Sequence, residues 1–245
     1  MEVSNCPQVI VSGCRFTNNT SLGIGVEQYS GNAGAIAIGY NDRPRPEYMQ
    51  SNPPMILVSE STFENNNATA AQAFQYDVSE VLSRQLYNQR GGSIACYFGT
   101  QSYSATVNIT RSTIRDSFAR DAGGGVYMFL AGDDNAHTVN IWKTDFINNK
   151  ALDGGGLEIT QSTPVSLTRP SRVSISSCNF VNNVGNFGGG FKSIQIDTHG
   201  NMNFVTVRNT SFSENQALVG SGLYLQSLYA IDTVRLEKRI IVEDW

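Results

Sequence analysis

Short segments with two β-branched residues at alternate positions recur along the chain and set its pattern of hydrophobic and polar positions. In most copies a phenylalanine follows the second β-branched residue after five positions. Alternation with a period of two predicts a short β-strand with one face in the core. The pairs are Val9 and Val11, Ile56 and Val58, Val107 and Ile109, Val139 and Ile141, Val173 and Ile175, and Val205 and Val207.

Two motifs follow each of these segments. The first contains a Phe and an Asn, and the second is a glycine-rich box, such as Gly154-Gly155-Gly156-Leu157. Phe146, Phe180 and Phe212 are separated by 34 and 32 residues, a period typical of repeat architectures. The first motif has the form Phe-X-X-Asn, and its six copies define repeats one to six: Phe16 and Asn19, Phe63 and Asn66, Ile114 and Ser117, Phe146 and Asn149, Phe180 and Asn183, and Phe212 and Asn215.

The spacing of apolar positions within a repeat predicts two corners. Ile141 and Thr144 are three residues apart, so the backbone must bend between them if both side chains face inward. A second corner is expected at the Asn pair, because Asn tolerates the left-handed conformation. Stacked Asn side chains are able to form hydrogen bonds from repeat to repeat. A third strand begins at the glycine box, where glycine permits close chain approach.

Three short strands, two tight corners and one variable loop in each repeat predict an all-β protein. The fold class is a parallel β-helix, a solenoid of about six to seven coils in which the repeats stack to share one core. One such copy is unable to bury its apolar residues alone, whereas a stack of copies buries them.

The paired Phe-X-X-Asn and Gly-Gly motifs resemble the repeats of the polymorphic outer-membrane (Pmp-like) protein family, within the pectin-lyase-like group of right-handed parallel β-helix proteins. The resemblance covers roughly residues 9 to 225. It implies a right-handed β-helix that is surface-exposed or secreted and often part of a larger chain, with adhesive roles in the bacterial members. Ile114 and Ser117 depart from the first motif, and Ala33 and Ser221 depart from the second.

One part of the chain that lies outside the regular pattern is an insertion in the second repeat. A short amphipathic helix is predicted near residues 70–89, because Phe74, Val78, Val81, Leu82 and Leu86 share one helical face.

Near the end of the chain, Val234 and Leu236 match the strand positions of a seventh copy. This alignment puts Ile241 at the Phe position and Asp244 at the Asn position. We expect residues 1–245 to form a single β-helix domain that is a fragment of a longer chain, or else a chain whose final residues act as a cap.

Composition excludes some classes of partner. The chain of 245 residues has a net charge of −4 and 16% charged residues, whereas nucleic-acid binding needs clustered Lys and Arg. No apolar run of about 18 residues is present, so we expect no direct membrane insertion of this segment. The Asn-X-Ser/Thr triplets are glycosylation candidates in a secreted eukaryotic protein, although a chain rich in these residues also forms them by chance: Asn18, Asn19, Asn67, Asn108 and Asn209.

The cysteines indicate buried thiols rather than disulfides. Cys14 and Cys178 both lie two residues before the repeat Phe, but in repeats one and five. That separation exceeds the Cα distance of about 7 Å that a disulfide can span. Cys96 occupies an inward position after the glycine box, where a small apolar side chain is expected.

Outward carboxylates are the natural place to look for chemistry, because β-helix polysaccharide enzymes place acid–base pairs or calcium ligands on neighbouring coils. The candidates are Asp116, Asp121, Asp145, Asp153 and Glu158. They form no ladder of paired acids, so we predict no catalytic residue, no metal site and no cofactor. His137 and His199 fall in predicted loops, where a solvated histidine is expected.

Three aromatic side chains are candidates for binding. Tyr97, Tyr127 and Phe129 are predicted to point outward from the third strands of adjacent coils, where exposed rings stack on sugars or anchor a protein partner. In the alternative, which we favour, the helix predicted near 70–89 covers them. Glu158 and Lys192 share an outward position one coil apart, which predicts an ion pair of small energetic value.

Together, the regular core and the lack of a carboxylate ladder indicate a non-catalytic β-helix module. We expect it to be extracellular or at the cell surface, with an adhesive or structural role in a larger assembly and a protein or glycan partner. The alternative is a polysaccharide-binding or polysaccharide-cleaving β-helix, either a lyase or a hydrolase.

Overall fold

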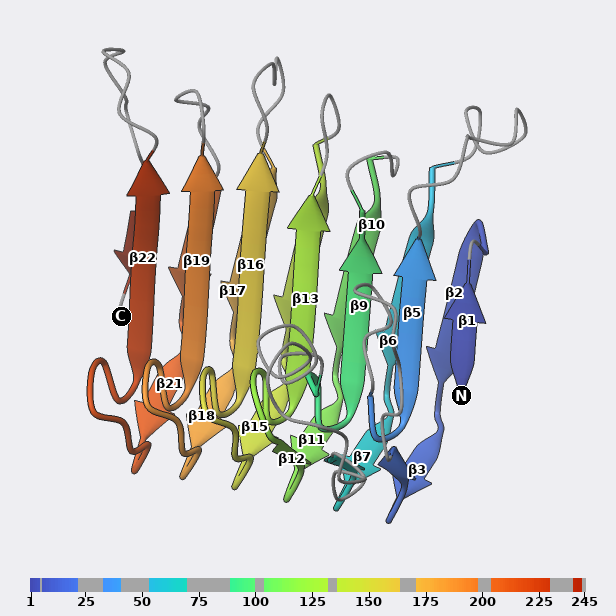
Figure 1. Ribbon diagram of the computed structural model, residues 1–245, viewed down its shortest axis with the longest axis horizontal. Helices are drawn as coiled ribbons and strands as arrows, with labels where there is room; N and C mark the ends of the chain where they lie inside the picture. Colours follow the sequence, from blue (N-terminus) through green and yellow to red (C-terminus); the bar gives the residue numbers. More distant parts are fainter. Residues whose placement is uncertain are drawn as a thin grey trace, which may run out of the picture.

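The computed structural model describes residues 1–4, 6–21, 33–40, 53–69, 89–99, 104–131, 136–163, 171–197, 204–229 and 240–243. Within these ranges the chain contains strands and turns but no helix, which confirms the prediction of an all-β protein. The strands pair in parallel and are stacked along the long axis of the molecule (Figure 1), a solenoid-like arrangement consistent with a parallel β-helix. Residues 70–88 of the helix predicted near 70–89 lie outside the described ranges, and Gln89, which is described, is not helical.

Four parallel sheets contain all the described strands. Sheet A comprises β1 (Glu2–Ser4), β5 (Ile36–Tyr40), β9 (Ile94–Phe98), β13 (Val126–Ala131), β16 (Leu157–Thr163), β19 (Phe191–Asp197) and β22 (Leu223–Tyr229). Sheet B comprises β2 (Gln8–Ser12), β6 (Met55–Ser59), β10 (Thr106–Thr110), β14 (Thr138–Trp142), β17 (Arg172–Ser176), β20 (Phe204–Arg208) and β23 (Ile240–Glu243).

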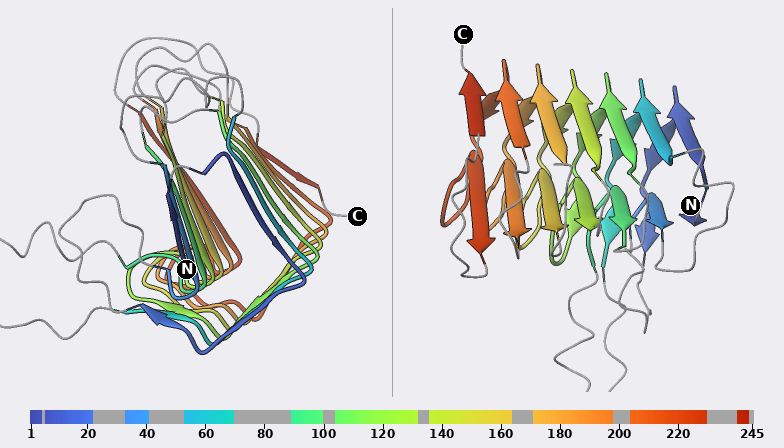
Figure 2. Two further views of the ribbon diagram at one scale, coloured as in Figure 1. Left: turned by 90° about the vertical axis from the view of Figure 1, so that its right-hand side faces the viewer. Right: turned by 90° about the horizontal axis from the view of Figure 1, so that it is seen from above.

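The two smaller sheets are formed by the short strands that follow the strands of sheet B in each repeat. Sheet C comprises β3 (Arg15–Thr17), β7 (Thr62–Glu64), β11 (Thr113–Arg115), β15 (Asp145–Ile147), β18 (Asn179–Val181) and β21 (Ser211–Ser213). Sheet D comprises β4 (Thr20–Ser21), β8 (Asn67–Ala68) and β12 (Phe118–Ala119). Viewed along the long axis, sheets A and B form two walls that sheet C joins at one side (Figure 2).

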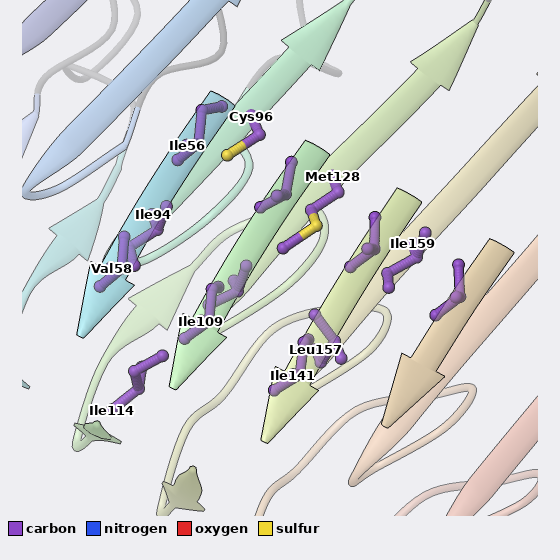
Figure 3. Close-up of a cluster of buried hydrophobic side chains, with 14 of the residues drawn as sticks. Ile56, Val58, Ile94, Cys96, Ile109, Ile114, Met128, Ile141, Leu157 and Ile159 are labelled. Carbon is purple, nitrogen blue, oxygen red and sulfur yellow. The ribbon is translucent and has the colours of Figure 1, made fainter. Parts of the chain in front are cut away.

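The core lies between these walls and is built from the inward residues of every repeat. All twelve β-branched residues that the alternation assigned to the core are buried. Figure 3 shows Ile109 and Ile141 of sheet B beside Met128 and Leu157 of sheet A. Burial of a side chain of this size contributes about 1.5–3 kcal/mol, so the repeated pattern supplies the main driving force for stacking.

Single residues in the left-handed conformation make the corners. The predicted bend between sheets B and C is present, and at this bend φ is positive at Gly13, Glu60, Arg111, Lys143, Ser177 and Asn209. The predicted corner at the Asn pair is also present, and φ is positive at the first residue of the pair: Asn18, Asn65, Asp116, Asn148, Asn182 and Glu214. Several of these residues are neither Gly nor Asn, so the stack imposes the conformation on them.

Aromatic rings stack along the inner side of sheet C. The ring centroids of Phe146 and Phe180 are 4.6 Å apart and those of Phe180 and Phe212 are 5.0 Å apart, with nearly parallel planes. Phe16 and Phe63 stack in the same way at 4.9 Å. Ile114 divides the stack into two, because β11 lies between β7 and β15.

The second Asn of each pair joins neighbouring repeats. The backbone N–H and side-chain Nδ2 of Asn149 both donate to Oδ1 of Asn183, each at 3.0 Å. Asn183 Nδ2 donates in turn to the carbonyl oxygen of Phe146 at 2.9 Å. Asn183 and Asn215 repeat the arrangement, and Ser117 accommodates the third repeat by donating its N–H to Asn149 Oδ1 at 3.1 Å. Buried turn amides therefore find acceptors in the next repeat.

A further ladder escaped the sequence analysis. The residue two positions before each Phe is Ser, Thr or Cys, and its side chain donates to the carbonyl oxygen two residues earlier, as Ser61 Oγ does to Ser59 at 2.8 Å. The same oxygen accepts the N–H of the preceding repeat, as Ser61 Oγ does from Cys14 at 3.1 Å. The signal was available, since all six copies carry a hydroxyl or thiol at this position.

The last strand has a different register from the predicted one. Strand β23 pairs with β20 so that Ile240 lies beside Val205 and Val242 beside Val207. Assigning these core positions to Val234 and Leu236, with Ile241 at the Phe position, was therefore wrong. Both segments satisfy the alternation, so a period of two is unable to choose between registers that differ by an even number of residues.

Candidate functional site

Two rows of side chains run along the outer face of sheet A, and together we call them the outer strip. The first row comes from the second residue of each strand, and the hydrogen-bond register aligns Ala95, Tyr127, Glu158, Lys192 and Tyr224. The second row comes from the corner that precedes each strand, where isolated bridges align Arg90, Ala122, Asp153, Phe187 and Val219.

Glycine brings the two rows together. In each repeat the residue of the second row is followed by a glycine with positive φ, such as Gly154 after Asp153 and Gly188 after Phe187. A Cβ at Gly154 would lie 2.7 Å from Cβ of Glu158, and one at Gly188 would lie 2.8 Å from Cβ of Lys192. The corner therefore packs directly against the outward side chains of its own repeat, and this close approach requires glycine.

Contacts in the outer strip run diagonally from one repeat to the next. Arg90 donates from Nη1 to the Tyr127 hydroxyl at 2.6 Å and lies 4.8 Å from the centre of its ring. Asp153 of repeat four contacts Lys192 of repeat five in the same way. The rings of Phe187 and Tyr224 are 5.4 Å apart. Each second-row residue in these pairs therefore binds the first-row residue of the following repeat.

The charged centre of the strip consists of Asp153, Glu158 and Lys192. Lys192 Nζ is 2.7 Å from Asp153 Oδ2 and 3.5 Å from Glu158 Oε2. The Lys192 and Glu158 side chains are each only 6% exposed, whereas Asp153 is 28% exposed. The predicted Glu158–Lys192 pair is present, but both groups are buried rather than exposed at the surface. Removing one partner would leave a buried charge uncompensated, which typically costs about 3–5 kcal/mol.

Glu158 is the unusual member of the centre. Its Oε1 accepts from Thr160 Oγ1 at 3.4 Å, while its Oε2 accepts no hydrogen bond from the described residues. Burial raises the pKa of Glu158 above the ordinary range of a carboxyl group, and the nearby Lys192 ammonium opposes that rise. The site thus combines a buried amine with two carboxyl groups, one of which favours its protonated form more than an exposed carboxyl does.

The aromatic candidates do not form one exposed row. Tyr97 is 8% exposed and Tyr127 is 2% exposed, while Phe129 is half-buried. Phe129 aligns with Tyr97 and stacks on it at 4.7 Å, whereas Tyr127 aligns with Ala95 and packs against Arg90. The two tyrosines thus offer little ring surface for stacking on a sugar. The helix that was expected to cover them lies outside the described residues.

The remaining acidic candidates also contact neighbouring repeats. Asp116 Oδ1 accepts from Asn148 Nδ2 at 3.0 Å, and Asp145 Oδ1 accepts from Asn179 Nδ2 at 2.7 Å. Asp121 Oδ2 accepts the N–H of Gln89 at 3.1 Å, and burial raises the pKa of Asp121. All five carboxylates considered from the sequence therefore serve as links between repeats.

The expectation of a solvated His137 was wrong. Its side chain is buried, Nδ1 accepts the N–H of Ala105 at 3.2 Å, and Nε2 lies 2.9 Å from the carbonyl oxygen of Ala131. These partners require the neutral tautomer with its proton on Nε2. His137 continues the inward alternation of β14 by one step, as Ala105 and Ser171 do in the neighbouring repeats. His199 lies outside the described residues.

Because of His137, we expect the protein to lose stability on mild acidification. Burial lowers the pKa of His137 to about 4 from the ordinary histidine value of 6.5. The unfolded chain therefore binds a proton that the folded chain excludes, so stability present above pH 6.5 is lost as the pH falls toward 4. This one group accounts for about 2 kcal/mol at pH 5. Urea denaturation at pH 7 and pH 5 measures the loss.

His137→Gln is the matched variant for this prediction, because it removes the titrating group and keeps a polar side chain. The stability difference between pH 7 and pH 5 should shrink by about 2 kcal/mol in the variant. An unchanged difference would show that other groups cause the acid sensitivity.

The structure separates the glycosylation candidates by exposure. Asn18 and Asn209 are exposed, while Asn19, Asn67 and Asn108 are half-buried. Asn19 Nδ2 donates to Asn66 Oδ1 at 2.8 Å, and a glycan would attach to that same nitrogen. Asn18 and Asn209 are thus the positions with the most room for a glycan.

The thiols differ with their place in the stack. Cys96 and Cys178 are buried, and burial raises the pKa of Cys96 to about 12 and that of Cys178 to about 11. Cys14 is exposed, so its predicted burial was wrong. Strand β3 of repeat one is the last strand of sheet C, so it has a neighbour on one side only, which is β7 of repeat two. Side chains of repeat one are therefore less covered.

Comparisons with protein-family models, with curated proteins and with solved structures found no match to this chain. Among the described residues, no three His, Cys, Asp or Glu side chains gather as they would to hold a metal ion. No helix in the described part of the chain has the length and apolar character needed to cross a membrane.

Proposed function

We propose that the protein is a non-catalytic β-helix module with an adhesive or structural role in a larger extracellular or cell-surface assembly. The observation that carries this proposal is the use of the outward acids. Asp116, Asp121, Asp145, Asp153 and Glu158 each contact a neighbouring repeat, so the carboxylates that a β-helix enzyme would present to substrate are engaged in holding the stack together.

The finer architecture belongs to the same proposal. We infer a right-handed parallel β-helix of about six to seven coils that forms a single domain over residues 1–245, with a short helical insertion near 70–89. The resemblance of the Phe-X-X-Asn and glycine-box repeats to the Pmp-like family supports the handedness and the surface location. A rod of this kind suits a spacer or adhesive stalk, because stacked repeats give stiffness and a long lateral surface.

Two features of the chain support the proposed location and partners. Asn18 and Asn209 present exposed acceptor triplets for glycosylation, as a secreted eukaryotic protein would. The low proportion of basic residues argues against nucleic acid, which leaves a protein or a glycan as the partner of the module.

A turnover assay tests the non-catalytic role. Incubation of the protein with pectin, alginate and related polysaccharides should release neither reducing ends nor unsaturated products. Asp145→Asn and Asp153→Asn should give the same result as the unaltered chain, because neither carboxylate is proposed to act on substrate. Turnover by the unaltered protein that either substitution abolished would overturn the proposal.

A polysaccharide-binding or polysaccharide-cleaving β-helix is the second candidate. The observation in its favour is the proximity of two carboxyl groups, Asp153 and Glu158, to one lysine, because acid–base cleavage needs groups with different proton affinities. Phe129 is the aromatic candidate that keeps part of its surface exposed. A glycan array on which the protein binds, and on which Phe129→Ala weakens that binding, would favour this candidate over the first.

A further inference from the structure

Lys192, Asp153 and Glu158 have the arrangement that amide formation between two side chains requires. The amine of Lys192 lies 2.7 Å from a carboxylate oxygen of Asp153, within reach of its carbonyl carbon. Oε2 of a second carboxyl group, Glu158, lies 3.5 Å from the same amine, and this buried oxygen accepts no hydrogen bond within the described residues. Fixed proximity of this kind replaces a bimolecular encounter and greatly accelerates the reaction of an amine with a carboxyl group.

We propose that Lys192 and Asp153 form an intramolecular isopeptide bond, with Glu158 relaying the protons, so that repeats four and five are covalently joined.

The reaction needs no oxidant and no second substrate. A proton first passes from the Lys192 ammonium to the Asp153 carboxylate along their hydrogen bond, which gives a neutral amine and a neutral acid. The nitrogen lone pair then attacks Cγ of Asp153. Glu158 accepts a proton from this nitrogen and donates one to the departing hydroxyl, so that water leaves and Glu158 returns to its initial state. One C–N bond forms, one C–O bond breaks, and one water molecule is released.

Two of the three groups are shielded from solvent. Lys192 and Glu158 are almost fully buried, and the Phe187 ring centre lies 5.8 Å from Lys192 Nζ. Burial raises the pKa of Glu158, and a raised proton affinity suits a group that passes protons between the reactants. Asp153 is the more exposed member of the three, which leaves a route for the released water.

Neighbouring repeats provide an internal comparison. At the positions of Asp153 and Lys192, other described repeats pair Arg90 with Tyr127, Ala122 with Glu158, and Phe187 with Tyr224. None of these combinations can form an amide. The reactive set therefore occupies one step of the outer strip, and the Arg90–Tyr127 and Phe187–Tyr224 steps are joined by non-covalent contacts of the same diagonal geometry. The inference is independent of the proposed function, because the chemistry depends on these three side chains alone.

Mass spectrometry of the purified, folded chain tests the bond. The intact mass should be lower than the sequence mass by one water molecule. Trypsin should yield peptide 151–172 joined to peptide 173–208, because Lys192 is no longer a cleavage site and Arg169 precedes Pro170. Fragmentation of this species should locate the link at Asp153 and Lys192.

Three variants and one control define the outcome. Lys192→Arg, Asp153→Ala and Glu158→Gln should each show the full sequence mass, with circular dichroism used to verify the fold. Lys143→Arg, the same change at an exposed lysine in the bend between β14 and β15, should retain the loss of water. The full mass in the unaltered folded protein would overturn the proposal. A loss of water that persists in Lys192→Arg would also overturn it. Such a loss would come from succinimide formation, in which the Asp153 side chain cyclises with the backbone amide of Gly154 and the two repeats stay unlinked.

Discussion

Replacing Gly155 with alanine is expected to prevent folding, or to lower the free energy of unfolding by more than about 4 kcal/mol. A Cβ at this position would lie 2.5 Å from the carbonyl oxygen of Gly189 and closer still to that of Val184. Both obstacles belong to the backbone of the next repeat. Hydrogen bonds hold that backbone in place, because Gly155 N–H donates to the carbonyl oxygen of Gly188 at 3.1 Å and Gly156 N–H donates to that of Gly189 at 3.0 Å.

Gly185→Ala is the matched control, since Gly185 lies in the neighbouring corner. A Cβ there would meet Gly155 N at 3.1 Å, a contact that a small shift relieves. We expect a loss within about 1 kcal/mol for this variant. Urea denaturation followed by circular dichroism compares the two proteins. An unfolding midpoint of Gly155→Ala close to that of the unaltered chain would contradict the tight corner.

Replacing Asn183 with alanine is expected to lower stability by about 3–5 kcal/mol, because several buried groups lose their partners at once. Asn183 is fully buried. Its Oδ1 accepts from the N–H and Nδ2 of Asn149, and its Nδ2 donates to the carbonyl oxygen of Phe146. Alanine leaves the buried Asn149 N–H without its acceptor and removes one hydrogen bond from the Phe146 carbonyl oxygen, and water has no access to replace the amide.

Asn179→Ala separates this effect from the general loss of an asparagine. Asn179 belongs to the same repeat and donates to Asp145 Oδ1 at 2.7 Å, but it is exposed. Water takes over its contacts, so we expect a loss of no more than about 1 kcal/mol. Equal losses in the two variants, measured by urea denaturation, would argue against a special role for the buried ladder.

The sequence predicted those parts of the fold that depend on local pattern. Alternating β-branched residues such as Val139 and Ile141 identified the inward face, and the odd spacing from Ile141 to Thr144 located the bend at Lys143. These features follow from chain geometry within one repeat. The repeat period then fixed which residues stand beside each other in neighbouring repeats, as the stack of Phe146 on Phe180 illustrates.

Features that depend on packing between distant segments were missed. Glu158 and Lys192 are outward residues of a strand, so the alternation places them at the surface. Their burial arises because the corner with Gly154 and Gly188 folds back over them. The register of β23 was missed for a different reason, since Val234 and Ile240 satisfy the same alternation and only the pairing partner distinguishes them.

The sequence could have revealed two further features. His137 was expected to be solvated because it was placed in a predicted loop, although its position continues the inward alternation of Val139 and Ile141. The hydroxyl or thiol ladder two residues before each Phe was visible in all six copies. The role of these side chains as hydrogen-bond donors becomes clear only from the structure. Cys178 Sγ, for example, takes the place of a hydroxyl and lies 3.3 Å from the Ser176 carbonyl oxygen.

Amide hydrogen exchange, measured by NMR, tests most directly the claim that the repeated side chains hold neighbouring repeats together. The Asn149 N–H donates to the Asn183 side chain, and the N–H of residue 183 donates to the Asn215 side chain. In the unaltered protein both amides should exchange slowly. In Asn183→Ala the Asn149 amide should exchange much faster, whereas the amide of residue 183 should stay protected. Rapid exchange of the Asn149 amide in the unaltered protein would contradict the claim.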